Sequence, residues 1–398
     1  MQLKEKNTKM LNIIKHMDID EVLKRGVAEL LPAGDNLKKL MQEKKITLYQ
    51  GFDPSMPSLH LGHLVGVMKL RQFQKLGHRV IFLIGDFTGM IGDPTDKQAT
   101  RKKLTREQVL ENSRTWVNQI KNILDFEGEN KAEIMYNSEW SDKVTFKDLI
   151  EISSNFTVQQ MIERDMYQER LKNNEPIYMH EFLYPIAQGY DCVFMDVNLE
   201  VGGSDQIFNM LAGRTLIKSI KNKEKYVLAT KLLVDKDGKK VGKTAGNALF
   251  LDSSPNEFYG GIMSFPDETI FPGFELLTEV ELSGLEEKIT HDPMGEKKRL
   301  AYEIVKLVWS EDEANKAKSH FENTFQEKAP SYNIKIESGG NLASAIAPYT
   351  NLKSISDAKR FIQQNSVDVN GKVATEPAYK VKIGDKIKVG EKVFIQII

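Results

Sequence analysis

The stretch ITLYQGFDPSMPSLHLGHLVGVMKLRQFQKLGHRVIFLIGD, residues 46–86, contains the pattern that decides the fold. It opens with a short run typical of a strand, residues 46–54, which ends in a turn. Apolar residues then recur at helical spacing over 64–76, and Gly77 is well placed to end that helix. The near-continuous apolar run at 79–86 is typical of a strand buried on both faces. A strand, a helix and a strand in this order predict a βαβ unit and therefore a parallel sheet.

Polar residues follow both strands of this unit. Ligands of open parallel sheets bind beyond the carboxyl ends of the strands, where Gly51-Phe52-Asp53 and Gly85-Asp86 would lie. Between the strands stand His60 and His63, at the start of the helix, with Gly62 allowing close approach to the backbone. Metal binding is the weakest reading of the two histidines, because no third ligand lies nearby in the sequence. Packing or capping and phosphate binding at the helix start both stay open.

The composition limits the class of protein. A chain of 398 residues predicts two or three domains, and 40% hydrophobic with 28% charged residues is ordinary for a soluble globular protein. The net charge of -1 does not indicate nucleic-acid binding by the chain as a whole. The single cysteine, Cys192, excludes an internal disulfide and a cysteine-based metal cluster. No apolar stretch is long enough to span a membrane and no signal peptide is recognisable, so we expect a cytoplasmic protein with no membrane partner.

Four further segments are assigned by periodicity. Residues 18–45 are expected to form helices interrupted near 31–34, and residues 105–173 to be mostly helical. A strand is expected around 191–200, before the glycine turn of VGGSDQ, and a helical region is expected to extend to about residue 328.

The last part of the chain, residues 340–398, has a different texture. KSISDAKRFIQQ predicts a helix, VDVNGKVA predicts a hairpin that turns at Asn370-Gly371, and the final alternating residues predict strands. This tail holds nine Lys and Arg residues against five acids. A solvated lysine face and an RNA-binding module are both consistent with that excess.

Several polar motifs have a structural reading beside a functional one. KKVGKT (239–244) suits a polyphosphate, although its spacing is not that of a P-loop and a surface loop is the plainer reading. In TGMIGDPTDKQATR (88–101), a helix capped by Asp93 would place Lys97 and Arg101 on one face, either for an anion or for salt bridges. YPIAQGYD (184–191) predicts a helix with a polar stripe that faces solvent or a pocket. GGSDQ (202–206) is either a plain turn or a site at a strand end.

The order of these motifs is more specific than any one of them. YQGFDPSMPSLHLGH, GDFTGMIGDP, YPIAQGYD, GGSDQ and KKVGKT together resemble bacterial tyrosyl-tRNA synthetases, with PSLHLGH similar to the HIGH signature and KVGKT to the KMSKS signature of class I enzymes. The resemblance implies an α/β fold with a Rossmann-like parallel-sheet catalytic domain carrying a helical insertion (1–235). A signature loop and helical anticodon-binding domain (236–335) would follow, and then a small basic α+β RNA-binding domain (340–398).

The resemblance also implies a reaction. The enzyme would activate L-tyrosine with ATP to tyrosyl-adenylate and pyrophosphate, and transfer the tyrosyl group to the terminal adenosine of tRNA(Tyr). ATP would bring Mg²⁺, no protein metal site or tightly bound cofactor is implied, and the family is homodimeric. The alternatives are a tryptophanyl-tRNA synthetase and a non-catalytic RNA-binding protein on a synthetase scaffold. Tyr49 and Asp191 favour tyrosine, because an indole offers one N–H donor and no acceptor.

The implied site residues fall into three groups. Tyrosine would be bound by Tyr49, Asp93, Tyr184, Gln188, Asp191 and Gln206. ATP would be bound by Gly51, Asp53, Ser55, His60, Gly62, His63, Asp205 and Lys243. The groups that stabilise the transition state would be His60, His63, Lys97, Arg101, Lys240, Lys243 and Thr244. The signature loop departs from the family pattern at Val241, Gly242 and Thr244, and Gln50 stands where some relatives carry a cysteine against the ribose.

Overall fold

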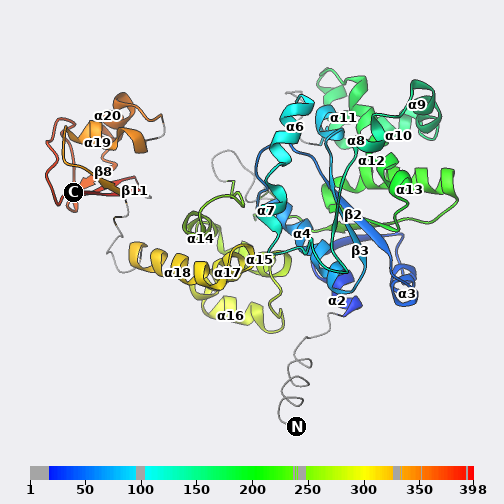
Figure 1. Ribbon diagram of the computed structural model, residues 1–398, viewed down its shortest axis with the longest axis horizontal. Coiled ribbons are helices and arrows are strands. Elements are labelled where there is room, and N and C mark those ends of the chain that lie inside the picture. The colour runs from blue at the N-terminus through cyan, green and yellow to red at the C-terminus, as the bar shows by residue number, and fades with distance from the viewer. Residues whose placement is uncertain are drawn as a thin grey trace, which may run out of the picture. The chain divides into compact units, whose positions relative to one another are not determined.

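The computed structural model describes residues 18–95, 104–235, 238, 240, 248–325, 332, 334–350, 352–390 and 393–398. The chain divides into two compact units, Met1–Asn315 and Lys316–Ile398, whose elements Figure 1 labels. The residues Lys97, Arg101, Val241, Gly242, Lys243 and Thr244 lie outside the described part of the chain.

A six-stranded sheet forms the centre of the first unit. Its strands are β1 (Val27–Leu31), β2 (Thr47–Phe52), β3 (Arg79–Ile84), β4 (Glu133–Tyr136), β5 (Leu199–Gly203) and β6 (Tyr226–Thr230), in the order β1-β6-β5-β2-β3-β4. All neighbouring pairs from β6 to β4 are parallel, and β1 runs antiparallel to β6 at the edge. The predicted βαβ unit is confirmed, because β2 and β3 pair in register, Leu48 with Val80, and α4 (Leu61–Lys75) connects them.

Helices cover the sheet and extend from it. Besides α4, the helices that precede α12 and β5 in the chain are α2 (Ile19–Lys24), α3 (Asn36–Glu43), α5 (Thr88–Ile91), α6 (Arg106–Ser113), α7 (Trp116–Ile120), α8 (Ser138–Ser141), α9 (Phe146–Ser153), α10 (Val158–Ile162) and α11 (Asp165–Lys172). The long helices α12 (Met179–Met195) and α13 (Ile207–Lys221) lie beside each other (Figure 1). Gly189 permits this close packing, since a Cβ there would lie 3.1 Å from the backbone of Gly213.

Two expectations from periodicity were wrong in part. Residues 27–31 form β1 instead of helix, because pairing with β6 supplies hydrogen bonds that the local pattern does not reveal. The region 105–173 is mostly helical, as expected, and also contains the short strand β4. The apolar run after Asp191 continues α12 to Met195, and the strand begins only at Leu199, after Asp196 ends the helix in the left-handed conformation at φ 51°.

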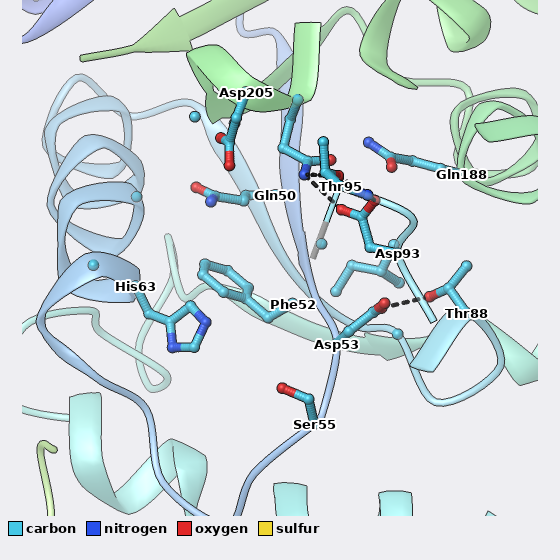
Figure 2. A pocket seen from close by; sticks show the side chains of 18 of the residues that line it. Gln50, Phe52, Asp53, Ser55, His63, Thr88, Asp93, Thr95, Gln188 and Asp205 are labelled. Atoms are coloured by element: carbon cyan, nitrogen blue, oxygen red, sulfur yellow. Dashed lines mark hydrogen bonds between the residues drawn. The ribbon is translucent and has the colours of Figure 1, made fainter. Parts of the chain in front are cut away.

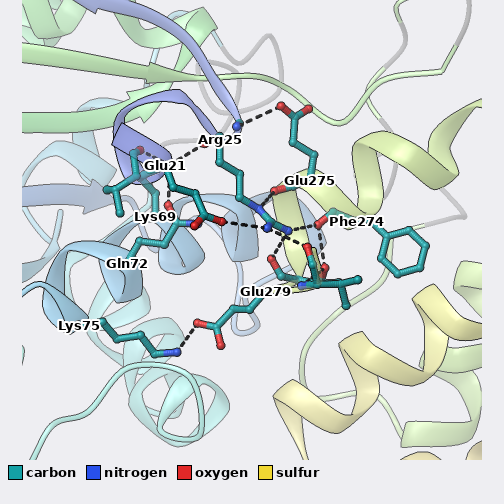
Figure 3. Close-up of polar contacts among 12 residues, drawn as sticks. Glu21, Arg25, Lys69, Gln72, Lys75, Phe274, Glu275 and Glu279 are labelled. Atoms are coloured by element: carbon teal, nitrogen blue, oxygen red, sulfur yellow. Dashed lines mark hydrogen bonds and ion pairs between the residues drawn. The ribbon is translucent and has the colours of Figure 1, made fainter. Parts of the chain in front are cut away.

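The helical region that follows the sheet consists of α14 (Pro255–Met263), α15 (Ile270–Leu277), α16 (Leu285–His291), α17 (Pro293–Val308) and α18 (Glu311–Phe325). The buried Arg25, at the end of α2, anchors it (Figure 3). Its guanidinium donates hydrogen bonds of 2.8–3.0 Å to the carbonyl oxygens of Phe274, Glu275, Thr278 and Val280. The carbonyls of Phe274, Glu275 and Thr278 lie at the C-terminal end of α15, where a helix leaves acceptors unsatisfied and favours a cation, and Val280 follows that end.

The second unit is an α+β fold, as predicted for the tail. Its strands β7 (Ile334–Ile336), β8 (Val367–Val369), β9 (Lys372–Val373), β10 (Lys386–Val389) and β11 (Val393–Ile397) form a sheet in the order β7-β11-β10-β8-β9. The helices α19 (Leu342–Ile346) and α20 (Ile355–Gln363) share its core. The predicted hairpin is confirmed: Asn370 and Gly371 both have positive φ, 51° and 79°, which a two-residue turn of this hand requires. Among the described helices of the whole chain, none has the length and apolar character to cross a membrane.

Candidate active site

A pocket of about 730 Å³ opens beyond the carboxyl ends of β2, β3 and β5 (Figure 2). This volume is in the range of sites for small molecules. The pocket is lined by every described residue that the sequence assigned to the site: Tyr49, Gly51, Asp53, Ser55, His60, Gly62, His63, Asp93, Tyr184, Gln188, Asp191, Asp205, Gln206 and Lys240. Segments from residue 49 to residue 240 therefore meet where a parallel sheet places its ligand.

Tyr49 and Asp191 form the buried end of the pocket. The Tyr49 side chain is fully buried, and its hydroxyl donates to the carboxylate of Glu200 at 2.7 Å. Asp191 accepts hydrogen bonds from Trp140 Nε1 at 2.7 Å and from Asn137 Nδ2 at 3.3 Å. Burial raises the pKa of Asp191 well above that of an ordinary aspartate, and these two donors oppose the shift. The polar stripe of α12 thus faces a pocket.

Glu200 and Lys225 are charged residues that the sequence reasoning missed. The Lys225 ammonium forms an ion pair with Glu200 Oε2, and both side chains are buried. Glu200 lies on β5 directly beside Tyr49 on β2, because the parallel register pairs these two residues. The available signal was Glu200 inside the run VNLEVGG and Lys225 directly before the apolar run YVLAT, since a buried charge requires a partner.

Acidic groups and their donors form the middle of the pocket. Asp53 accepts from the Tyr184 hydroxyl at 2.7 Å and from the Thr88 hydroxyl at 2.6 Å. Burial raises the pKa of Asp53 to about 7, even though these two hydrogen bonds act in the opposite direction. Asp93 accepts from Gln206 Nε2 at 2.6 Å and from the Thr95 backbone N–H at 2.8 Å (Figure 2). Three elements therefore direct carboxylates and hydroxyls into one space, which suits a cationic group.

The histidines lie at the opposite end, at the start of α4. His60 is the N-cap residue, and its Nδ1 accepts from the Gly62 backbone N–H at 3.1 Å. His63 Nδ1 accepts from the His60 backbone N–H at 3.2 Å, and the two rings stack with centroids 3.7 Å apart. Because Nδ1 accepts in both rings, each neutral imidazole carries its proton on Nε2. The two histidines therefore cap the start of α4, which is one of the interpretations left open by the sequence, and this capping orients both rings.

Two other contacts tie later parts of the chain to this helix start. Backbone hydrogen bonds connect Leu61 N–H to Leu249 O at 2.9 Å and Leu251 N–H to Leu59 O at 2.8 Å. Lys240 forms an ion pair with Asp205, with Nζ 2.5 Å from Oδ2. The described residues on both sides of the 241–247 segment are thus anchored to the pocket.

The chain is similar to known proteins over nearly its whole length. Residues 41–326 match the family model for tRNA synthetases class I (W and Y), and residues 350–387 match the S4 domain. The tyrosine–tRNA ligase of Aquifex aeolicus is 39% identical, with 95% of this chain and 97% of that protein covered. That of Carboxydothermus hydrogenoformans is 41% identical at the same coverage of 95% and 97%. The crystal structure of a C-terminally truncated mitochondrial tyrosyl-tRNA synthetase from Coccidioides posadasii superposes with a TM-score of 0.63 and 26% identity, covering 80% of this chain and 95% of that chain.

Proposed function

The chain belongs to the tyrosine–tRNA ligases among the class I tRNA synthetases, and on that premise we propose that its pocket activates L-tyrosine with ATP and then charges tRNA(Tyr). The observation that carries the proposal is the polarity of the pocket. One end is closed and offers a phenol and a carboxyl group, and the other end is a helix start with two oriented imidazoles. A substrate that is phenolic at one end and reacts with a polyphosphate at the other fits this arrangement.

Tyrosine occupies the end that lies along β2 and α12. Tyr49 and Asp191 contact its phenol, and phenylalanine would leave both groups without a partner in a buried site. Tyrosyl-tRNA synthetases are themselves the established example of an enzyme that rejects phenylalanine because it lacks the hydroxyl group of tyrosine. The ammonium group is held by Asp93, Tyr184 and Gln188, and Gln206 lies near the carboxylate.

Chemistry at the other end needs no enzyme base. The carboxylate of tyrosine is ionised at neutral pH and attacks the α-phosphorus of ATP directly. The protein holds the two groups in line and stabilises the charge that develops on the phosphoryl oxygens and on pyrophosphate. His60 and His63 donate from Nε2, beside the positive end of the α4 dipole. Lys240, together with Lys97, Arg101, Lys243 and Thr244, is assigned to the leaving group.

The remaining ATP contacts lie along the pocket wall. Asp205 is assigned to the ribose, while Gly51, Asp53, Ser55 and Gly62 surround the adenylate. Since Lys240 is paired with Asp205 in the free protein, it exchanges this carboxylate for phosphate when ATP binds. Mg²⁺ would neutralise phosphate charge. We assign the ion to the phosphates of ATP, because Mg²⁺ is usually bound through substrate phosphates and one or two carboxylates instead of a cage made by the protein alone.

The second unit is assigned to tRNA binding. Within residues 340–398, seven of the described basic residues are exposed: Lys353, Lys359, Arg360, Lys372, Lys380, Lys382 and Lys386. Two of its acids, Asp357 and Asp385, are buried and accept local hydrogen bonds. The outer surface is consequently more basic than the composition suggests, which favours the phosphate backbone of RNA.

A homodimer is the expected assembly, and an apolar surface of the first unit supports it. The exposed side chains are Phe146 (78%), Ile150 (55%), Val158 (71%), Tyr178 (57%) and Met179 (77%) on α9, α10 and the start of α12. Large exposed apolar groups near one another are typical of protein interfaces. Sedimentation analysis of the wild type and of Phe146→Asp tests this assembly, and a monomeric wild type would contradict it. A cytoplasmic location also remains a prediction.

Exchange of labelled pyrophosphate into ATP tests the proposed reaction. We expect exchange that depends on tyrosine, is much weaker with phenylalanine and is absent with tryptophan. Exchange that proceeds faster with tryptophan would assign the pocket to the alternative enzyme of the same family. A folded protein that supports no exchange with either amino acid, yet binds RNA, would favour a non-catalytic scaffold. Aminoacylation of tRNA(Tyr) then tests the second step.

A further inference from the structure

We propose that Glu200, held by Lys225, is the positioning residue for tyrosine recognition: it accepts the hydrogen bond of the Tyr49 hydroxyl and so leaves the Tyr49 oxygen as an acceptor for the substrate phenol. This inference rests on the proposed function, in which Tyr49 contacts the phenol. It concerns two residues that the site assignments above do not include. Neither Glu200 nor Lys225 has a role in the phosphate chemistry proposed for the pocket.

The carboxylate of Glu200 is surrounded by donors on both of its oxygens. Oε1 accepts from the Tyr49 hydroxyl at 2.7 Å and from Gln188 Nε2 at 2.8 Å. Oε2 accepts from the Lys225 ammonium and from the thiol of Cys192, whose Sγ is 3.2 Å away. An ionised carboxylate offers about four acceptor positions and no donor, so this set uses its whole capacity. Tyr49 has one proton, and its shortest hydrogen bond is the one to Glu200 Oε1; Cys192 Sγ lies 3.1 Å and the Gln188 carbonyl oxygen 3.5 Å from the same hydroxyl.

Lys225 places a cation directly beside the buried carboxylate of Glu200. Its ammonium also donates to the carbonyl oxygen of Met210 at 2.7 Å, which fixes it between α13 and β5. Gly213 leaves the space, because a Cβ at that position would lie 3.0 Å from Nζ of Lys225 and 2.5 Å from Sγ of Cys192. A buried charge without such a partner would be strongly unfavourable. The ion pair is thus built into the contact between the helix and the sheet.

The proton count at the phenol follows from this direction. A substrate phenol that meets Tyr49 must donate its single proton to the Tyr49 oxygen. Its own oxygen then accepts from Asp191, which carries a proton in this arrangement. The complete burial of Asp191 raises its pKa and is consistent with a neutral carboxyl group. The hydrogen bonds run in one direction, from Asp191 through the phenol and Tyr49 to Glu200.

The same contact orients Gln188. Because Nε2 of Gln188 donates to Glu200, the amide oxygen is the end that remains to accept from the ammonium group of tyrosine. One buried ion pair therefore sets the hydrogen-bond direction of two groups that line the pocket.

A double-mutant cycle tests the proposal. The combined change Glu200→Gln with Lys225→Met removes the buried ion pair without leaving one charge alone. The amide group introduced by Glu200→Gln can donate a hydrogen bond to the Tyr49 oxygen as well as accept one from the Tyr49 hydroxyl. We expect the ratio of kcat/KM for tyrosine over phenylalanine to fall roughly tenfold to a hundredfold, which is the range for losing a hydrogen bond to a charged group. The loss should lie in KM for tyrosine, with phenylalanine unaffected.

The second arm of the cycle repeats the change in a Tyr49→Phe background. With the hydroxyl already absent, the combined change should alter the ratio no further. The control is Arg214→Gln with Glu224→Gln, which removes an exposed ion pair (2.7 Å) that joins α13 to the segment before β6. It should leave the ratio unchanged. Two results would overturn the proposal and make Glu200 a structural residue. In one, the combined variant lowers kcat/KM for tyrosine and for phenylalanine equally. In the other, the combined change lowers the ratio further in the Tyr49→Phe background.

A structure of the wild type with bound L-tyrosine keeps the proposal testable if the variants do not fold. The contact between Tyr49 and Glu200 must persist in that complex, and a Tyr49 hydroxyl that has turned from Glu200 to the phenol would overturn it. Failure of the proposed function is recognised separately. A wild type that does not activate tyrosine removes both claims, whereas an active wild type with an unchanged ratio removes only this one.

Discussion

The two ends of the pocket are built differently. At the phenol end, Tyr49, Asp191 and Glu200 are buried and take partners from the protein itself. At the phosphate end, the Lys240 side chain is 41% exposed and is paired with Asp205, a group that the substrate is expected to claim. We therefore propose that folding arranges the tyrosine end in advance, whereas the binding of ATP requires the ion pair between Lys240 and Asp205 to exchange. Changes at the first end should appear in stability and in the KM for tyrosine, and changes at the second end in kcat or in the KM for ATP.

The largest effect is expected from isolating one charge at the phenol end. Lys225→Met alone leaves the Glu200 carboxylate buried without a cation, which should lower the free energy of unfolding by about 3–5 kcal/mol. Urea denaturation of the free protein measures this. The exposed pair supplies the control, because Arg214→Gln should cost less than about 1 kcal/mol. Equal losses in the two variants would remove the contrast between a preformed end and an adaptable end.

A large effect on the reaction is expected at the phosphate end. Lys240→Met should reduce kcat of tyrosine-dependent pyrophosphate exchange by roughly a hundredfold to a thousandfold, the cost of losing one group that stabilises transition-state charge. The KM for tyrosine should stay close to that of the wild type. Steady-state exchange kinetics at saturating ATP would reveal the pattern. A rise in the KM for tyrosine with unchanged kcat would contradict the assignment of Lys240 to the phosphate end of the pocket.

The middle of the pocket should show itself in the pH dependence of stability. The pKa of Asp53 is raised by burial to about 7, from 3.8 in an exposed aspartate. Between these values the folded protein holds a proton that the unfolded chain has released, so stability falls as pH rises, by up to about 1.4 kcal/mol per pH unit. Asp53→Asn should flatten the stability profile between about pH 4 and pH 7. The exposed Asp252→Asn is the control, and a profile that is equally steep in both variants would contradict the shift.

The smallest effect concerns Gln50, which lines the pocket near Asp205 (Figure 2). Its Oε1 is buried and has no hydrogen-bond partner in the protein, and its side chain fills the space above Gly66, where a Cβ would lie 2.1 Å from that oxygen. Gln50→Ala should raise the KM for ATP by roughly threefold to tenfold, the range for one neutral hydrogen bond. The KM for tyrosine should not change. An unaltered KM for ATP would contradict a contact between Gln50 Oε1 and ATP.

Strong local patterns predicted much of the fold, whereas the residues of the pocket were implied by the family resemblance. The helix between β2 and β3, the stripe at Tyr184 and Gln188, and the Asn370-Gly371 turn each follow from spacing or from turn chemistry within a few residues. Strand β1 could not be predicted in this way, because its hydrogen bonds come from β6, about two hundred residues later. Glu200 and Lys225 were missed for a related reason. Each is visible as a charge within or directly before an apolar run, but only the fold shows that the two charges meet. The roles of Lys97, Arg101, Lys243 and Thr244 stay predictions.

A crystal structure with a non-hydrolysable tyrosyl-adenylate analogue tests the division of the pocket most directly. We expect the phenol oxygen within hydrogen-bonding distance of Tyr49 and Asp191, and the phosphoryl group beside His60 and His63. The ion pair between Lys240 and Asp205 should be broken, with Asp205 on the ribose. An analogue bound with its phenol away from Tyr49, or with its phosphoryl group remote from both histidines, would contradict the assignment of the two ends.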